Sequence, residues 1–165
     1  MIRRAALLVS LLCLGGCGLH PLYGGGSGSA VSATLKAVTV AAIPGKSGWL
    51  VRNKLVDRLG ESGQATAGYR LDVSLEDNIT AFGLRSDQAA TRERRTLRAR
   101  YQLVDLRSGQ VVLDATAGSD AGIDIVSSEY ATVAAEQTAL ENLSDIVADQ
   151  IVARLALYAS RTGAK

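Results

Sequence analysis

Apolar and polar residues alternate most regularly in the middle of the chain, and this alternation predicts β-strands with one buried face. The first such stretch runs from Tyr69 to Ile79, and the second runs from Leu97 to Leu103. Residues 105–109 then have the composition of a tight turn, and the apolar run Val111–Ala117 comes next. The pattern therefore predicts a β-hairpin whose second strand is antiparallel to the 97–103 strand.

Helical periodicity occurs on both sides of this region. Apolar residues mark one helix face in Trp49–Leu59, and Ser47 is the expected N-cap. Glu129–Ser160 contains neither Gly nor Pro, which predicts a long amphipathic helix capped by Ser127 or Ser128,. The expected apolar stripe of this helix consists of Val133, Leu140, Leu143, Val147, Ile151 and Leu155.

A further strand is expected before the shorter helix, because Leu35–Ile43 is rich in Val, Ala and Thr and stops at Pro-Gly,. The predicted fold class is α+β: a four-stranded, mostly antiparallel sheet with two helices packed on one face. The pattern leaves open whether the first strand pairs in parallel. The domain is expected to span residues 34–160, followed by a tail at 161–165.

The amino terminus has the organisation of a secretory signal peptide. Two arginines are followed by the apolar segment Ala5–Leu14, which is too short for the roughly 20 residues of a membrane-spanning helix,. Small residues then lead to Cys17, as in a lipobox. We expect a cleaved signal peptide at residues 1–16, with diacylglycerol and an N-acyl chain on Cys17. An ordinary signal peptide with a coincidental cysteine is the less favoured alternative.

The residues after Cys17 favour a periplasmic domain anchored to the outer membrane. Gly18 stands where an aspartate usually retains Gram-negative lipoproteins in the inner membrane. A Gly/Ser run at 24–29 belongs to an expected linker over residues 17–33,. The run is not followed by the Lys-Ser/Thr of a phosphate-binding P-loop, so we do not expect it to bind nucleotides.

Charge and composition exclude several functions. Without Arg3 and Arg4 the mature chain has 16 basic and 16 acidic residues, so its overall charge gives no reason to expect nucleic-acid binding,. Aromatic residues make up 4% of the chain, which disfavours a base-stacking surface,. His20 is the single histidine and Cys13 lies inside the signal. We therefore expect neither catalysis nor a metal or cofactor site.

The string from Cys17 to Gly24, Cys-Gly-Leu-His-Pro-Leu-Tyr-Gly, resembles the start of LptE, the lipopolysaccharide-assembly lipoprotein family, in its alphaproteobacterial form. Leu19 replaces the phenylalanine that is frequent in that form, and Thr138 stands where an acidic residue is expected. Shorter similarities continue along the chain, at residues 50–55, 69–73, 99–105 and 128–136.

This resemblance implies a sheet-and-helix domain that sits inside the outer-membrane barrel LptD and assists its assembly. It also implies a part in placing lipopolysaccharide in the outer leaflet, with the lipid anchor of the domain in the inner leaflet. Two alternatives remain open. One is a lipoprotein of a phospholipid-trafficking ABC system, and the other is a periplasmic or wall-modifying enzyme.

One basic cluster is a candidate contact for lipopolysaccharide or for the barrel. It consists of Arg92, Arg94, Arg95, Arg98 and Arg100. On an extended chain the four even-numbered arginines project to one side, where they could bind lipid A phosphates or acidic groups of the barrel lumen. Arg95 breaks the alternation, so regular strand pairing is expected only after it. The alternative is a solvated strand face. Trp49 is expected to be either an interface anchor or buried near the helix start.

Overall fold

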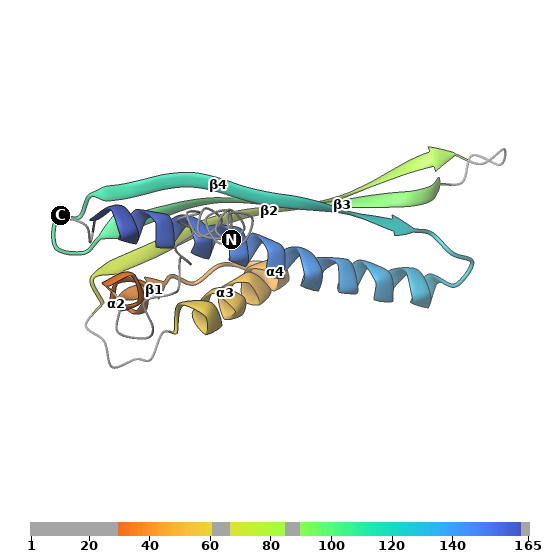
Figure 1. Cartoon of the computed structure of the whole chain (residues 1–165). Coiled ribbons are helices and arrows are strands. Elements are labelled where there is room, and N and C mark those ends of the chain that lie inside the picture. Colours follow the sequence, from red (N-terminus) through yellow and green to blue (C-terminus); the bar gives the residue numbers. More distant parts are fainter. Residues whose placement is uncertain (1–29, 61–66, 85–89, 163–165) are drawn as a thin grey trace, which may run out of the picture.

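The computed structural model describes residues 30–60, 67–84 and 90–162. The predictions for the signal peptide, Cys17, His20 and the Gly/Ser run lie outside the described residues. In chain order the described elements are α2 (Ala30–Lys36), β1 (Val38–Val40), α3 (Gly45–Leu59), β2 (Tyr69–Leu84), β3 (Ala90–Asp105), β4 (Val111–Asp124) and α4 (Glu129–Thr162). The predicted α+β class is confirmed (Figure 1).

The four strands form one open sheet in the order β1-β2-β3-β4. Strands β2, β3 and β4 are antiparallel neighbours, as the alternation predicted. Strand β1 runs parallel to β2, with Val38 opposite Tyr69, so the sheet is mixed. The intervening helix α3 makes this parallel pairing possible, because parallel strands need a crossover connection.

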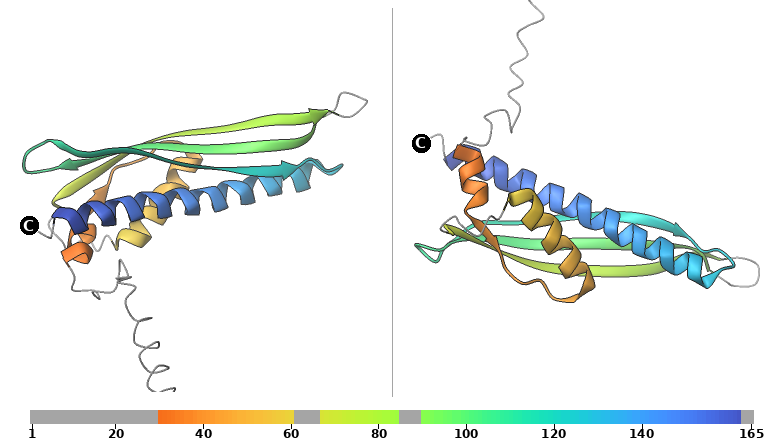
Figure 2. Two further views of the ribbon diagram at one scale, coloured as in Figure 1. Left: turned by 45° about the horizontal axis from the view of Figure 1, so that its top comes forward. Right: turned by 90° about the horizontal axis from the view of Figure 1, so that it is seen from below.

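The helices lie on one face of the sheet and leave the other face open (Figure 2). Helix α4 has 34 residues, equivalent to about 51 Å, and runs along the sheet beside the shorter α3,. The core between the layers is aliphatic, and Tyr101 is the largest side chain buried in it. No described helix, including α4, combines the length and the apolar character that crossing a membrane requires.

The amino-terminal elements differ from the prediction. The strand expected over residues 35–43 is reduced to three residues, because Leu35 belongs to α2 and packs into the core from that helix. Helix α2 thus begins within the residues assigned to the linker, and it is a third helix where two were predicted. Helix α3 starts at Gly45 rather than Trp49, and its N-cap is Pro44 instead of Ser47. Pro44 has the extended backbone of an N-cap, which places Ser47 inside the first turn,.

The central strands are longer than the alternation indicated. Strand β2 extends beyond Ile79 to Leu84, β3 begins at Ala90, and β4 extends past Ala117 to Asp124. The expectation that pairing starts only after Arg95 is wrong, since Arg92 already pairs with Phe82 of β2. Most residues at this end of the sheet are charged, polar or small, so apolar alternation could not reveal it.

Helix α4 begins as predicted, and the Ser128 hydroxyl accepts a hydrogen bond from the Ala131 N–H at 3.4 Å. Five of the six stripe residues are buried, but Val133 is 60% exposed. The first turns of α4 extend past the start of α3 and therefore have no neighbouring helix there (Figure 2). Trp49 is 63% exposed, so the alternative that it is buried is wrong.

Candidate functional site: the open face of the sheet

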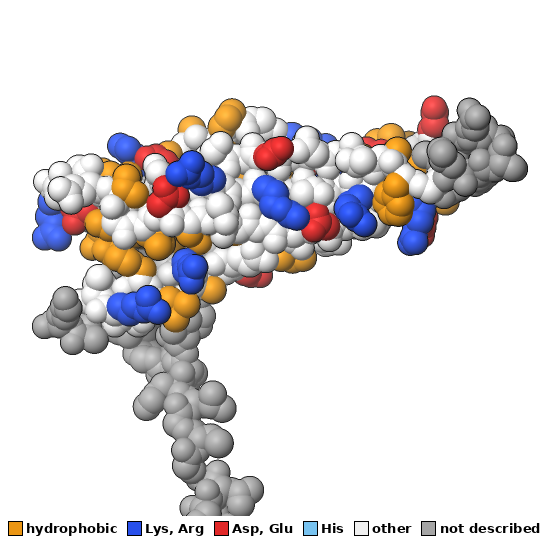
Figure 3. Space-filling model, turned by 90° about the horizontal axis from the view of Figure 1, so that it is seen from above, with side chains coloured by type: hydrophobic (Ala, Val, Ile, Leu, Met, Phe, Trp, Pro, Cys, Tyr) orange, Lys and Arg blue, Asp and Glu red, His pale blue; other side chains and the backbone are white. Residues whose placement is uncertain are grey.

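The face of the sheet that no helix covers, here called the open face, is built from the even-numbered residues of β2, β3 and the distal part of β4. Successive side chains of a strand point to opposite faces, so these residues lie together. Basic and acidic side chains are interspersed on this face (Figure 3). It carries four of the five predicted arginines: Arg92, Arg94, Arg98 and Arg100.

Three of these arginines are paired with aspartates of β4, and we call this set the arginine–aspartate ladder. The Arg92 Nε lies 2.8 Å from Asp124 Oδ1, directly across the strand pair. The other two pairs run diagonally to the neighbouring strand, as cross-strand geometry allows. They join Arg98 to Asp120 at 3.0 Å and Arg100 to Asp114 at 2.9 Å.

The ladder favours the ionised form of two of its carboxylates, Asp114 and Asp120. Hydrogen bonds from Arg100 and then Gln102 lower the pKa of Asp114. Hydrogen bonds from the Thr96 hydroxyl and then Arg98 lower the pKa of Asp120. Each of the three guanidinium groups is paired with one aspartate, so this part of the open face is polar but close to neutral. It is not the uncompensated basic row that the sequence suggested.

Arg94 is arranged differently from its neighbours. Its guanidinium lies over the Phe82 ring, 5.4 Å from the ring centroid, and it forms no ion pair with another described residue. The residue opposite it on β4 is Gly122, where an added Cβ would meet no atom within 4 Å. Arg94 is therefore the arginine of the open face with the most room to bind an incoming anion.

Arg95 lies on the opposite face, against the helices. Its guanidinium donates two hydrogen bonds to Asp77, at 2.8 and 2.7 Å, and a third to the Glu136 carbonyl oxygen at 3.0 Å. The two paired side chains are 13% and 19% exposed. Arg95 thus joins β2, β3 and α4 and is separated from the other four arginines. Its odd position in a regular strand was the signal that could have placed it there.

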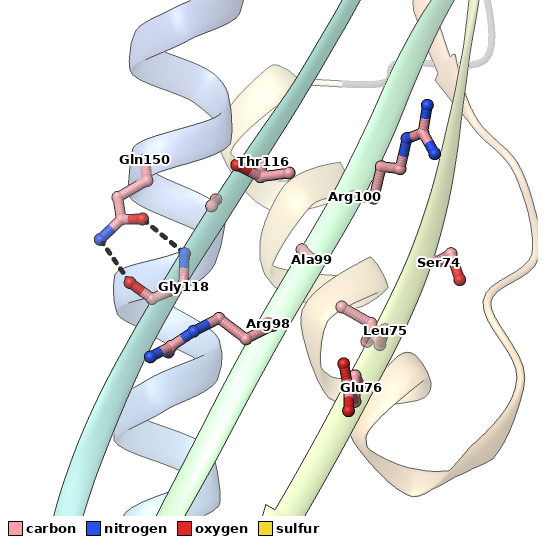
Figure 4. Close-up of a pocket in the computed structure, with 10 residues that line it drawn as sticks. Ser74, Leu75, Glu76, Arg98, Ala99, Arg100, Thr116, Gly118 and Gln150 are labelled. Carbon is pink, nitrogen blue, oxygen red and sulfur yellow. Dashed lines mark hydrogen bonds between the residues drawn. The ribbon is translucent and has the colours of Figure 1, made fainter.

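A hollow of about 660 Å³ lies on the open face between Arg98 and Arg100 (Figure 4). Its floor is made of small residues, including Ala99 and Gly118. The Arg98 side chain passes over Gly118, where a Cβ would come within 2.5 Å of the arginine Cδ. The hollow is bordered by charges of both signs, because Glu76 also lines it.

At the edge of this hollow, helix α4 reaches around strand β4. The Gly118 N–H donates to the Gln150 side-chain oxygen at 2.9 Å, and the Gln150 amide donates back to the Gly118 carbonyl at 3.3 Å (Figure 4). The glutamine thereby occupies backbone groups that an edge strand would otherwise expose. No local pattern in the sequence predicts this contact, because it depends on where α4 passes the sheet.

Residues that could hold a metal ion do not come together in the described ranges, 30–60, 67–84 and 90–162. The open face instead offers guanidinium groups, carboxylates and small polar side chains. These groups can bind polar or charged surfaces through hydrogen bonds and ion pairs.

The fold and the open face define a two-layer α+β domain of the type found in several bacterial lipoproteins. The LptE family, described as lipopolysaccharide-assembly, matches this chain over residues 35–155. The chain belongs to this family. A search of the curated proteins gives no match to it.

Solved structures show the same fold. A Caulobacter crescentus structure described as a lipoprotein is 25% identical, with a TM-score of 0.67 over 79% of this chain and 96% of that one. The rare lipoprotein B of Shewanella oneidensis is 11% identical, with a TM-score of 0.59 over 76% and 96% of the two chains. A minor lipoprotein of Acinetobacter baumannii is 15% identical, with a TM-score of 0.54 over 73% and 92%.

Proposed function

We propose that this lipopolysaccharide-assembly protein is anchored to the inner leaflet of the outer membrane through lipid on Cys17. In this proposal its domain occupies the lumen of the LptD barrel, assists the assembly of that barrel and takes part in inserting lipopolysaccharide into the outer leaflet. Membership of the LptE family supports the general function. The lipobox-like residues before Cys17 support the anchor.

The observation that carries the barrel partnership is the chemistry of the open face. The lumen of an outer-membrane barrel is polar, so a domain inside it needs a polar surface on which few charges lack a partner. The arginine–aspartate ladder provides such a surface along β3 and β4. The long, slender two-layer shape also suits a cylindrical space (Figure 1).

The ladder also suggests separate roles for the arginines. A phosphate that bound Arg92, Arg98 or Arg100 would have to displace an aspartate that already holds the guanidinium. These three arginines therefore suit hydrogen bonding to the barrel wall. Among the described residues no carboxylate lies at ion-pair distance from Arg94, which Asp120 attracts only at longer range, so Arg94 is the better candidate for a lipid phosphate,. Arg95 is assigned to stabilising the domain.

The test is a mild-detergent purification of the tagged full-length protein from outer membranes, with the mass of each partner determined. Recovery of a large barrel protein at near one-to-one ratio is the expected result. Recovery of an inner-membrane ABC permease would overturn the proposal and favour phospholipid trafficking. Cys17→Ala is the matched variant for the anchor, and it should lose the lipid mass and move to the soluble periplasmic fraction.

A second experiment separates the two arginine roles. Arg94→Glu should lower the binding of purified lipopolysaccharide and leave barrel recovery unchanged. Arg98→Glu places a second acid beside Asp120 and should lower barrel recovery through repulsion,. Equal effects of both variants on both readouts would contradict this division.

A further inference from the structure

The outer edge of strand β2 is paired over only a short part of its length. Strand β1 covers it at Tyr69 and Leu71, whose backbone groups bond Ala37 and Ala41. The backbone groups of alternate residues point to the same edge, and the register with β3 is unbroken from Tyr69 to Phe82,. The outward-pointing N–H and C=O groups that follow belong to Val73, Leu75, Asp77, Ile79 and Ala81. None of these groups bonds another described residue on that side.

This edge lacks the features that usually prevent strands from pairing with another chain. From Val73 to Ala81 it contains no proline and no lysine, and its pairing with β3 has no bulge,. Its one inward-pointing charge, Asp77, is neutralised by Arg95. The edge of β4 differs, because Gln150 of α4 bonds its backbone at Gly118.

A partly apolar groove lies beside the unpaired edge, and we call it the distal groove. Arg95, Glu136 and Gln137 contribute polar groups to its lining. The groove has a volume of about 590 Å³ and lies between β2, the start of α3 and the first turns of α4. Its apolar lining is exposed: Ile79 at 42%, Tyr130 at 86% and Val133 at 60%. Lys46 also lines the groove and forms no ion pair with another described residue.

We propose that β2 accepts an added strand along Val73–Ala81, supplied by an extended segment of the partner protein. Alternate side chains of that segment would enter the distal groove, with an apolar residue against Tyr130 and Val133 and a carboxylate near Lys46. In such strand addition, backbone hydrogen bonds provide the affinity, and the groove that receives the side chains provides the specificity. The inference rests on the proposed function, in which the partner is the barrel protein.

A strand fits this site better than a lipid chain does. The groove alone could hold an acyl chain, but the edge presents a row of backbone donors and acceptors that hydrocarbon cannot satisfy,. A polypeptide segment matches both features at once. The added strand would extend the row that β1 begins beside β2. The chain leaves that row after Ala41, whose N–H still bonds the Leu71 carbonyl.

Amide hydrogen exchange of the full-length protein, first alone in detergent and then in its purified barrel complex, tests the proposal. The amides of Leu75, Asp77 and Ile79 should exchange rapidly in the free protein and roughly a hundredfold more slowly in the complex. Amides of the intervening residues already face β3 and should be slow in both states. Slowing restricted to the outward-pointing amides therefore reports strand pairing rather than general burial.

Matched variants separate backbone pairing from side-chain contact. Ile79→Pro removes an outward N–H on an edge where proline is tolerated, and should weaken the complex about tenfold. Ile79→Thr keeps the N–H and should weaken it by less than about threefold. Val133→Glu should also weaken the complex, whereas Ile146→Glu, at a position on α4 outside the groove that is 42% exposed, should not. Circular dichroism and thermal melting verify the fold of each variant.

The possible outcomes are distinct. A barrel complex in which the outward-pointing amides remain fast overturns this inference and leaves the proposed function intact. Slow amides in the free protein, together with a dimeric mass, identify a second copy as the occupant and also overturn it. If Val133→Glu weakens the complex but Ile79→Pro does not, the groove holds side chains or lipid without strand addition. Failure of the barrel to co-purify overturns the proposed function and this inference together.

Discussion

Replacing Arg95 by alanine removes the half-buried cation that joins two strands to helix α4, and we expect a large loss of stability. The variant would leave the Asp77 carboxylate, 19% exposed, without its counterion. It would also remove the hydrogen bond to the Glu136 carbonyl. An equivalent change at Arg92 disrupts a pair whose side chains are 57% and 72% exposed, and is the matched control.

The magnitudes follow from these exposures. Breaking a buried ion pair by removing one partner costs about 3–5 kcal/mol, and the partial exposure of this pair puts the Arg95→Ala cost near 3 kcal/mol. Exposed pairs contribute about 0–1 kcal/mol, so Arg92→Ala should cost less than about 1 kcal/mol. The double-mutant cycle of Arg95→Ala with Asp77→Ala should give a coupling energy of about 2 kcal/mol.

The assay is urea unfolding of the full-length protein in detergent, monitored by circular dichroism, for both single variants and the cycle. Equal losses for Arg95→Ala and Arg92→Ala would refute the argument that burial separates these two arginines. A coupling energy near zero would show that Asp77 is not the partner that matters.

Three further changes test other features. Gly48→Ala places a Cβ 2.6 Å from a backbone oxygen before α3 and should cost about 2 kcal/mol in urea unfolding, whereas Gly122→Ala, in open space, should cost less than about 0.5 kcal/mol,. Burial, and then the nearby Glu136 carboxyl, raise the pKa of Glu93 above 4.5. Folding therefore favours the protonated form of Glu93. The stability that this side chain contributes is present below pH 4.5 and is lost as the pH rises through the raised pKa. Glu93→Gln, which cannot ionise, should therefore raise the melting temperature only at the higher pH,. Gln150→Ala should speed amide exchange at the β4 edge and increase aggregation,.

Each of these three predictions would be contradicted by a specific result. Similar losses for the two glycine variants would show that the close approach before α3 can relax. An effect of Glu93→Gln that is constant across pH would exclude a titrating carboxyl. Unchanged exchange in Gln150→Ala would mean that the β4 edge is protected by something other than this side chain.

Features that depend on local pattern could be predicted from the amino-acid sequence. Alternation at Tyr69–Ile79 and Leu97–Leu103 predicted the antiparallel strands, because a half-buried strand needs every second residue apolar. The absence of Gly and Pro predicted α4 over almost its full length. The family resemblance likewise came from contiguous strings of residues, and the family match over residues 35–155 confirms it.

Strand pairing, the face that each side chain occupies and its burial depend on residues that are distant in the chain, so they could be read only from the tertiary structure. The alternation could not show that β1 pairs in parallel, nor that the strands continue where few residues are apolar. The odd position of Arg95 separates it from the other four arginines only if the strand is regular from Arg92 onward, and the structure shows that it is. Burial at a given position depends on which helix crosses it. Helix α3 begins only beside the middle of α4, which is why Val133 and Ile79 remain exposed next to the unpaired edge of β2.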